Sequence, residues 1–211
     1  MFGLQFLGDE GAWKYAVRAS FGLVLFVAFR PWRWYAPPRI RDVGPAIVTG
    51  IVVLGIWILP EIKWGASTPL IQELYLRFAI LPLGKLPATD VQSVYAPAVC
   101  GWGLTIVRLA GSALVIAVIE EFFWRGFLYR WVVDKHFLNV QLKDFDWEAF
   151  LMVGVLFGLE HNRWLVGILA GAAYTLLMLK TRSIWAPCLA HIVTNLLLGL
   201  YVLVSGNYVF W

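Results

Sequence analysis

Charged residues are scarce in this sequence. Asp, Glu, Lys and Arg together make up 14% of its 211 residues, whereas 61% of the residues are hydrophobic. A soluble globular domain of this composition would lack the polar side chains needed to cover its surface. Long apolar runs stand where charges are missing, and about 20 apolar residues are enough for a helix to cross the hydrocarbon core of a bilayer. The composition therefore predicts an integral membrane protein.

Cysteine is nearly absent as well. Cys100 and Cys188 are the only two cysteines, and they lie in separate apolar segments. That spacing fits neither a metal knuckle nor a disulfide framework, so we interpret both as buried structural thiols. The net charge of +4 is not accompanied by a basic stripe or a recognition motif, so we expect no nucleic-acid partner.

Internal repeats, low-complexity stretches and linkers are also missing. The sequence thus predicts a single membrane-embedded domain over residues 1–211, with N-terminal spans and a loop in 1–92 and a core in 93–211. The fold class that we expect is an all-α bundle of about six to seven transmembrane helices. The expected membrane-embedded segments are 13–29, 43–60, 93–110 continuing into 111–133, 148–162, 164–180 and 183–204.

Two regions, 93–133 and 61–92, are not expected to form a single straight transmembrane helix. Residues 93–133 in one straight helix would reach about twice the hydrocarbon thickness, so we expect a kink or a break. The glycines at which it is expected are Gly101, Gly103 and Gly111. Residues 61–92 mix charges with prolines and glycines, which indicates a loop with an amphipathic interfacial piece at 70–81.

Basic residues gather in three of the expected loops. If the spans alternate, all three loops fall on the same side of the membrane. The positive-inside rule then predicts that this side is cytoplasmic and that both termini lie on the other side. The basic residues are Arg30, Arg33, Arg39 and Arg41 in one loop, Arg130, Lys135 and Lys143 in another, and Lys180 and Arg182 in a third.

Two carboxylates and an arginine interrupt the apolar run that follows Gly111. Ionisable groups within a membrane helix mark either a functional site or a buried ion pair. Glu121 and Arg125 are four residues apart and share a helix face, which favours an ion pair with a supporting, structural role. Glu120 points about 100° away from that face. One arginine cannot offset two carboxylates, so Glu120 is the functional candidate.

Two histidines lie in other apolar segments. Phe157 and His161 are four residues apart, and so are His191 and Asn195 near the C-terminus, so each pair shares a helical face. A lone histidine in an apolar helix is more often a satisfied core residue than a catalyst. Two of them, together with a spare glutamate, favour a site. His136 follows charged residues in a loop, where we expect a surface position.

Depth along the helices indicates that these residues can meet. Counted from the same membrane side, Glu120 and His161 both lie about 20 Å in, His191 about 14 Å and Asn195 about 20 Å. Apolar surroundings disfavour the charged form of a glutamate, which suits a general base that deprotonates a water held jointly with His161. His191 and the Asn195 amide could supply donors to the negative charge that develops on an attacked carbonyl.

Other membrane-protease signatures are missing: the sequence contains no G-x-S-G serine motif, no G-x-G-D aspartyl motif and no H-E-x-x-H zinc helix. Our prediction is a site without metal or other cofactor. One alternative stays open, because two imidazoles and one carboxylate can ligate zinc. Its ligands would be His161, His191 and Glu120.

The ordered motifs resemble a known family. Glu-Glu-x-x-x-Arg at 120–125, Phe-x-x-x-His at 157–161 and His-x-x-x-Asn at 191–195 are similar to those of the CPBP family, the CAAX prenyl endopeptidase and bacteriocin-processing membrane proteins. These are regarded as glutamic intramembrane proteases. The resemblance implies Glu120 as base, His161 as its partner in water activation, and His191 with Asn195 as the oxyanion site. It makes Glu121 and Arg125 supporting residues.

A narrower resemblance extends over most of the chain. The stretches 124–128, 157–161 and 194–211 resemble the CAAX-protease-related proteins associated with exosortase and PEP-CTERM sorting systems. This resemblance implies a multi-pass protein of a bacterial inner membrane. Its partners would be membrane lipids and a membrane-associated peptide or protein substrate of such a sorting system. The alternative from another class is a non-proteolytic scaffold or immunity-type binding protein, since a satisfied polar network can use the same residues.

Overall fold

The computed structural model describes residues 11–62, 69–86 and 93–211. Within these ranges every regular element is a helix and no strand occurs. Two parts of the predicted 61–92 loop, residues 63–68 and 87–92, lie outside the described residues. The polytopic all-helical bundle expected from the composition is therefore confirmed, and this protein is a multi-pass membrane protein.

Five helical stretches are long and apolar enough to cross a membrane. A sixth apolar helix, α7 (Trp147–Leu159), is shorter and packs against α8. Their order and boundaries agree with the predicted segments to within a few residues. The five are α1 (Ala12–Phe29), α2 (Val43–Ile58) with its flanking 3-10 turns, the composite helix Pro97–Val133, α8 (Trp164–Thr181) and α9 (Trp185–Ser205).

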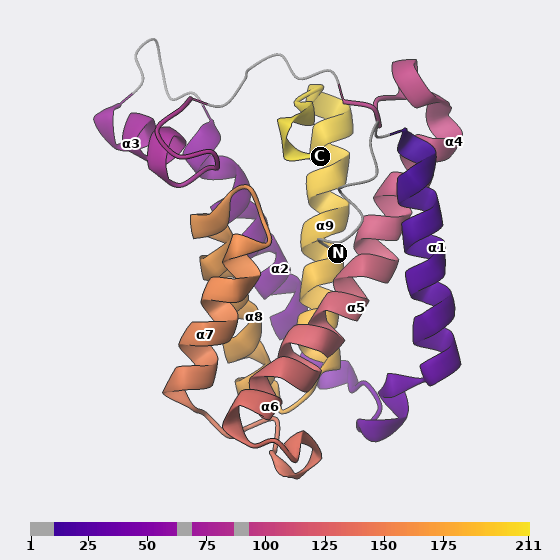
Figure 1. Ribbon diagram of the computed structural model, residues 1–211, viewed down its shortest axis with the longest axis vertical. Coiled ribbons are helices and arrows are strands. Elements are labelled where there is room, and N and C mark those ends of the chain that lie inside the picture. The colour runs from indigo at the N-terminus through magenta and orange to yellow at the C-terminus, as the bar shows by residue number, and fades with distance from the viewer. Residues whose placement is uncertain (1–10, 63–68, 87–92) are drawn as a thin grey trace.

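The composite helix runs obliquely across the bundle (Figure 1). It contains α4 (Pro97–Ala110), the π-helical η5 (Gly111–Ile116), α5 (Ala117–Glu121), the π-helical η6 (Phe122–Leu128) and α6 (Tyr129–Val133). The expected interruption occurs at Gly101, where φ is 78° and ψ 158°, a conformation that favours glycine. At Gly111 the helix widens instead of breaking. The five residues of α5 thus stand between two π-helical turns, which occur frequently at functional sites.

The predicted helix 148–162 is too long at its C-terminal end. Asp146 caps its start by accepting a hydrogen bond from the Ala149 N–H (2.8 Å), but α7 ends at Leu159. Four consecutive polar residues, 160–163, form the turn to α8. Gly158 allows α8 to approach this turn, since a Cβ there would lie 2.5 Å from the Trp164 carbonyl oxygen. His161 consequently lies in a turn and not in a helix.

Helix α9 lies in the middle of the bundle, where it packs against α2, α5 and α8 (Figure 1). Its approach to α2 depends on Gly50: a Cβ at this position would lie 2.6 Å from the Ala190 carbonyl oxygen. Small residues at such contacts let two helix backbones come close, which is how membrane helices gain packing contacts. This central position places His191 and Asn195, one turn apart on α9, against the composite helix.

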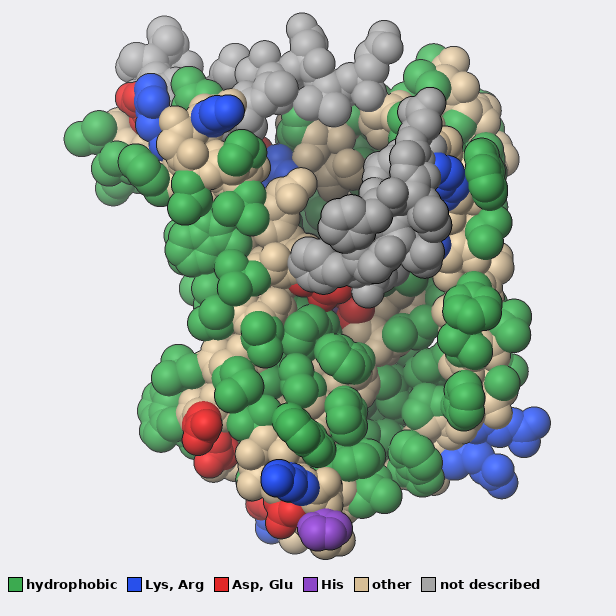
Figure 2. Space-filling view, in the orientation of Figure 1, with side chains coloured by type: hydrophobic (Ala, Val, Ile, Leu, Met, Phe, Trp, Pro, Cys, Tyr) green, Lys and Arg blue, Asp and Glu red, His purple; other side chains and the backbone are tan. Residues whose placement is uncertain are grey.

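The three basic loops lie together at one end of the bundle. Arg39 donates a hydrogen bond to the Thr181 carbonyl, and Arg130 donates to the Tyr35 hydroxyl (3.3 Å), so each loop contacts another. Lys and Arg side chains are visible at this lower end of the molecule in Figure 2. The prediction that these loops share one side is confirmed. That the side is cytoplasmic stays a prediction.

The predicted amphipathic piece at 70–81 is present as α3 (Leu70–Phe78). Glu73 and Arg77 form an ion pair along it, with 2.9 Å between Oε1 and Nη2, and Leu70 and Ile71 are exposed. Its location at a membrane surface stays a prediction.

Candidate active site

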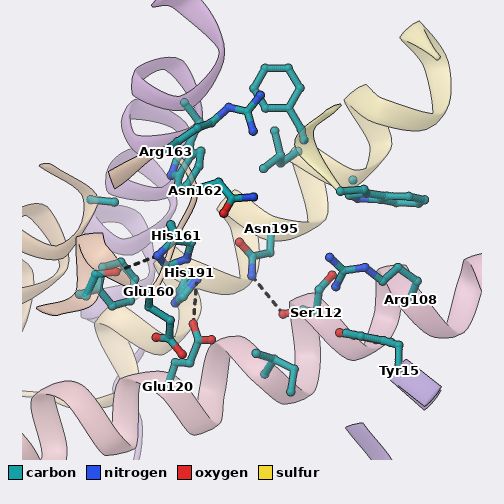
Figure 3. Close-up of a pocket in the computed structure, with 18 of the residues that line it drawn as sticks. Tyr15, Arg108, Ser112, Glu120, Glu160, His161, Asn162, Arg163, His191 and Asn195 are labelled. Carbon is teal, nitrogen blue, oxygen red and sulfur yellow. Dashed lines mark hydrogen bonds and ion pairs between the residues drawn. The ribbon is translucent and has the colours of Figure 1, made fainter. Parts of the chain in front are cut away.

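A cavity of about 460 Å³ opens between the composite helix, α9 and the α7–α8 turn. All four residues singled out from the sequence line it: Glu120 from α5, His161 from the turn, and His191 and Asn195 from α9 (Figure 3). The structure therefore brings the four together, although they lie up to 75 positions apart in the chain (195 minus 120).

Glu120 faces this cavity. Its Oε2 lies 3.8 Å from Nε2 of His191, and the Glu120 side chain is 15% exposed. Of the two histidines, His191 is the one within ion-pair distance of Glu120. The prediction from the sequence was a water shared by Glu120 and His161, and it did not include this contact between Glu120 and His191. His161 reaches the same cavity from a different side.

Glu121 points away from the cavity into the protein interior. Its Oε1 accepts hydrogen bonds from Arg125 Nη1 (3.1 Å) and His191 Nδ1 (2.9 Å), and the side chains of Glu121 and Arg125 are fully buried. Arg125 also donates to the Gly171 carbonyl (2.9 Å) and lies 4.4 Å over the ring of Phe157. The expected ion pair is present, and it holds His191 as well.

The His191 ring is fixed from two directions. Glu121 accepts at Nδ1, so the opposite nitrogen, Nε2, is directed at Glu120 and the cavity. Tyr174 stacks on the ring at 4.9 Å between centroids with an interplanar angle of 24°, and its hydroxyl donates to Thr194 (2.8 Å). This arrangement lets Nε2 exchange a proton with Glu120 without rotation of the ring.

His161 is oriented by its own backbone. Nδ1 lies 2.8 Å from the Phe157 carbonyl oxygen, and a carbonyl can only accept, so Nδ1 carries the hydrogen. Nε2 is then the nitrogen that can accept a hydrogen bond. The ring packs edge-on against Trp57, with 5.4 Å between centroids. His161 is thereby suited to accept a hydrogen bond from a water in the cavity.

Asn195 lies one turn beyond His191 along α9. Its Nδ2 donates one hydrogen bond to the Ser112 carbonyl of η5 (3.1 Å). An amide nitrogen carries two hydrogens, so one donor remains for a ligand in the cavity. The π-helical turn at 111–116 presents the Ser112 carbonyl that sets the amide orientation.

Several cavity residues were not singled out from the sequence. Glu160 lines the cavity beside His161, and its Oε2 is buried without a hydrogen-bond partner in the part of the chain that the structure describes. Arg108 lies 4.4 Å over the Tyr15 ring, and its Nε is likewise buried and unpaired. Arg108 stands alone in an apolar span, the same signal that marked Glu120. Nothing in the sequence indicates that Tyr15 would reach the cavity.

The turn that carries His161 is tied to the rest of the molecule by Arg163. Arg163 forms a buried ion pair with Glu61 at the end of α2, donates to the Val209 carbonyl (2.9 Å) and lies 4.3 Å over the Phe210 ring. The C-terminal residues Val209, Phe210 and Trp211 line the cavity as a result. No sequence motif points to this contribution.

The alternative zinc set was tested against the geometry. Within residues 11–62, 69–86 and 93–211, no group of three His, Cys, Asp or Glu residues is arranged so that it could hold a metal ion. Glu120, His161 and His191 are therefore not assembled as a ligand set in this conformation.

Comparison with known proteins finds a match over the part of the chain that carries the candidate residues. Residues 101–197 match the family model described as Type II CAAX prenyl endopeptidase Rce1-like. This segment includes Glu120, Glu121, Arg125, His161, His191 and Asn195. No curated protein and no solved structure matches the chain. The match confirms the CAAX prenyl protease resemblance of the motifs, although not the exosortase-associated subfamily. Residues 101–197 of this membrane protein, a little under half of the chain, are thus similar to the Rce1-like family of type II CAAX prenyl endopeptidases.

Proposed function

We propose that this protein is an intramembrane endopeptidase that hydrolyses a peptide bond of a membrane-associated protein or peptide with a water activated by Glu120. The observation that carries the proposal is that two adjacent carboxylates differ in their burial and in their partners. Glu121 is fully buried and paired with Arg125 and His191, whereas Glu120 faces the cavity next to His191 Nε2. The similarity of this segment to a protease family supports the reaction class.

The charges of the cluster support a proton shared between Glu120 and His191. Arg125 balances Glu121, so one positive charge is missing if Glu120 is ionised. A proton on His191 supplies it, and moving that proton to Glu120 leaves both groups neutral. In either case the four groups sum to zero, which lowers the cost of burying them in a low-dielectric site. Glu120 can thus act as base while His191 Nε2–H acts as donor.

Hydrolysis then follows in two steps. A water in the cavity donates one hydrogen bond to Glu120 and one to His161 Nε2, and its oxygen attacks the carbonyl carbon as Glu120 takes the proton. The carbon–nitrogen bond next breaks, and Glu120 returns the proton to the leaving amine. The products are a carboxylic acid and an amine, with one water consumed.

Negative charge on the attacked carbonyl oxygen needs donors in the cavity. Nε2–H of protonated His191 and the second N–H of Asn195 lie one helical turn apart on α9 and can donate to one oxygen between them. The Glu121 carboxylate at Nδ1 holds the ring so that Nε2 faces the cavity. We therefore assign the oxyanion site to His191 and Asn195, with Glu121 and Arg125 as positioning residues.

The substrate class follows from where the cavity lies. Spans α1, α9 and the composite helix contribute to its wall, which supports our proposal of a peptide that reaches it from the membrane. We propose a multi-pass protein of a bacterial inner membrane, with a substrate that belongs to an exosortase or PEP-CTERM sorting system. Support for these two details is the resemblance of stretches 124–128, 157–161 and 194–211, and they are independent of the chemistry.

The experiment compares cells that produce the wild-type protein with cells that produce Glu120→Gln at equal levels. Gln matches Glu in size but cannot accept a proton in this reaction. Quantitative peptide analysis of the membrane fraction should find a peptide released by the wild type alone. Asp134→Asn, an exposed acidic residue far from the cavity, is the matched control and should behave as the wild type. If the Glu120→Gln cells kept the wild-type phenotype and released the same peptides as the wild type, the non-proteolytic scaffold or binding protein would be favoured instead.

A further inference from the structure

A second cavity lies at the basic end of the bundle, away from the proposed active site. Its volume is about 340 Å³, which is within the range of small-ligand sites. The α1–α2 loop, the end of α6, the α6–α7 loop and the end of α8 form its wall. The residues that line it are Trp34, Tyr35, Ala36, Arg130, Leu138, Val140, Gln141, Leu142, Lys143 and Arg182.

Three cations line this cavity without a compensating carboxylate. The lining from the described residues includes Arg130, Lys143 and Arg182 but no Asp or Glu. None of the three forms an ion pair with a carboxylate in the part of the chain that the structure describes. Asp144 is next in sequence to Lys143, but its Oδ2 accepts a hydrogen bond from the Gln141 N–H (2.9 Å).

Arg130 is a buried cation that is held in the wall of this cavity. It is only 6% exposed, and its guanidinium donates to the carbonyls of Val140 (2.9 Å) and Leu138 (3.1 Å) as well as to the Tyr35 hydroxyl (3.3 Å). These acceptors are uncharged, so they fix the guanidinium in the wall without neutralising it. Nη2 has one further hydrogen beyond the bond to Leu138. An anion would further stabilise this buried cation, and the cavity beside it has room for one.

The location indicates where the counter-charge comes from. The cavity lies among the loops at one end of the bundle, where helices leave the hydrocarbon core and lipid phosphates are found. Trp34 is 61% exposed, and Trp185 donates to the Ala36 carbonyl (2.9 Å), which is the aromatic arrangement typical of a membrane interface. Basic pockets between transmembrane helices on the cytoplasmic side of a membrane bind anionic lipid head groups. The positive-inside rule predicts this side for the three basic loops.

We propose that this cavity binds the phosphate of an anionic phospholipid. Arg130 forms its floor, and Lys143 and Arg182 hold the phosphate from the rim. The acyl chains then extend along the apolar outer surface of the bundle. This site is independent of the proposed peptidase chemistry, because none of its residues lines the catalytic cavity.

The test uses the purified full-length protein in detergent and needs no protease substrate. Short-chain phosphatidylglycerol, phosphatidylcholine with the same chains, and inorganic phosphate are titrated separately. Binding is read from native mass spectrometry and from the thermal midpoint. Phosphatidylglycerol should bind and raise the midpoint, while phosphatidylcholine and inorganic phosphate should have little effect at the same concentration.

Charge variants at the rim localise the binding. Each removed cation near a membrane surface should weaken affinity about fivefold, so Lys143→Gln with Arg182→Gln should weaken it about 25-fold. Both side chains are exposed, so the double variant should fold normally. Lys135→Gln with Arg41→Gln removes two exposed charges outside the cavity and should leave the affinity unchanged.

Three results would overturn the proposal. Equal binding of the two lipids would remove the anion selectivity. An equal effect of inorganic phosphate would assign the cavity to a soluble anion. Unchanged phosphatidylglycerol affinity in the Lys143→Gln, Arg182→Gln variant would place the lipid elsewhere on the protein.

Discussion

The two sides of the His191 ring differ in how the charges of their carboxylates are compensated. Behind the ring, Glu121 and Arg125 are fully buried and bonded to each other and to neighbouring groups. In front of it, the cavity contains the partly exposed Glu120 and Glu160, and among the described residues neither of them forms an ion pair with an Arg or Lys. A buried carboxylate that is ion-paired with an arginine stabilises and positions its neighbours, whereas a carboxylate without such a cation beside a cavity can accept a proton. Adjacent residues on one helix thus serve folding and chemistry separately.

The largest effect on stability is expected behind the ring. Arg125→Ala leaves Glu121 buried without its ion-pair partner, and breaking a buried pair in this way costs about 3–5 kcal/mol. The thermal midpoint and the yield in detergent should both fall. Arg33→Ala, which removes the same side chain from an exposed loop position, should change neither. Full stability of Arg125→Ala together with lost activity would move Arg125 from a positioning role to direct contact with the substrate.

Substitution of Asn195, which lines the cavity, should lower turnover without changing stability. Asn195→Ala removes one donor to the oxyanion, and loss of one such donor reduces kcat about 10²–10³-fold. KM should change little, because the interaction forms chiefly in the transition state. Steady-state kinetics measure both values, with the substrate from which the wild type releases a peptide. Asn139→Ala, in an exposed loop, is the control. A rise in KM at constant kcat would make Asn195 a substrate-binding residue.

A smaller effect is expected at Glu160, the second carboxylate of the cavity. Glu120, not Glu160, is the carboxylate for which an ion pair with His191 is observed. Glu160→Gln should therefore reduce turnover by less than the roughly 100-fold that marks the loss of a general base. The same kinetic assay measures it. A larger loss at Glu160 than at Glu120 would exchange the roles of the two glutamates.

The smallest effect is expected from removal of metal. Proton transfer by Glu120 needs no metal, so exhaustive chelation should leave turnover unchanged and the purified protein should contain no stoichiometric metal. Elemental analysis and the peptide assay check both points. One tightly held zinc per chain, with activity lost on its removal and restored on its return, would make Glu120, His161 and His191 its ligands.

Much of the fold could be predicted from the sequence because a bilayer imposes simple rules. Apolar length set the spans, and helical spacing paired Glu121 with Arg125 as the structure has them. The interruption at Gly101 was also expected, since a straight helix would be too long. The π-helical turns on both sides of α5 have no sequence pattern of their own, because they change the hydrogen-bond register without changing the apolar composition.

The site was predictable only in part for a related reason. Helix faces and depth indicated that Glu120, His161, His191 and Asn195 could meet, but tertiary contacts decide where a helix ends. The Arg163–Glu61 ion pair, which joins residues 102 positions apart, is associated with the turn that displaced His161 from α7. Arg108 and the C-terminal residues that line the cavity depend on similar long-range contacts. Only the three-dimensional structure supplies them.

One paired measurement tests the division between the two glutamates most directly. Glu120→Gln and Glu121→Gln are purified beside the wild type, and the thermal midpoint and the turnover of the released-peptide substrate are measured for each. Our account predicts that Glu120→Gln keeps the wild-type midpoint and loses about 10²–10⁴-fold in turnover. Glu121→Gln should lower the midpoint because Arg125 is left without a charged partner. Wild-type turnover of a well-folded Glu120→Gln protein would contradict the assignment of Glu120 as the base.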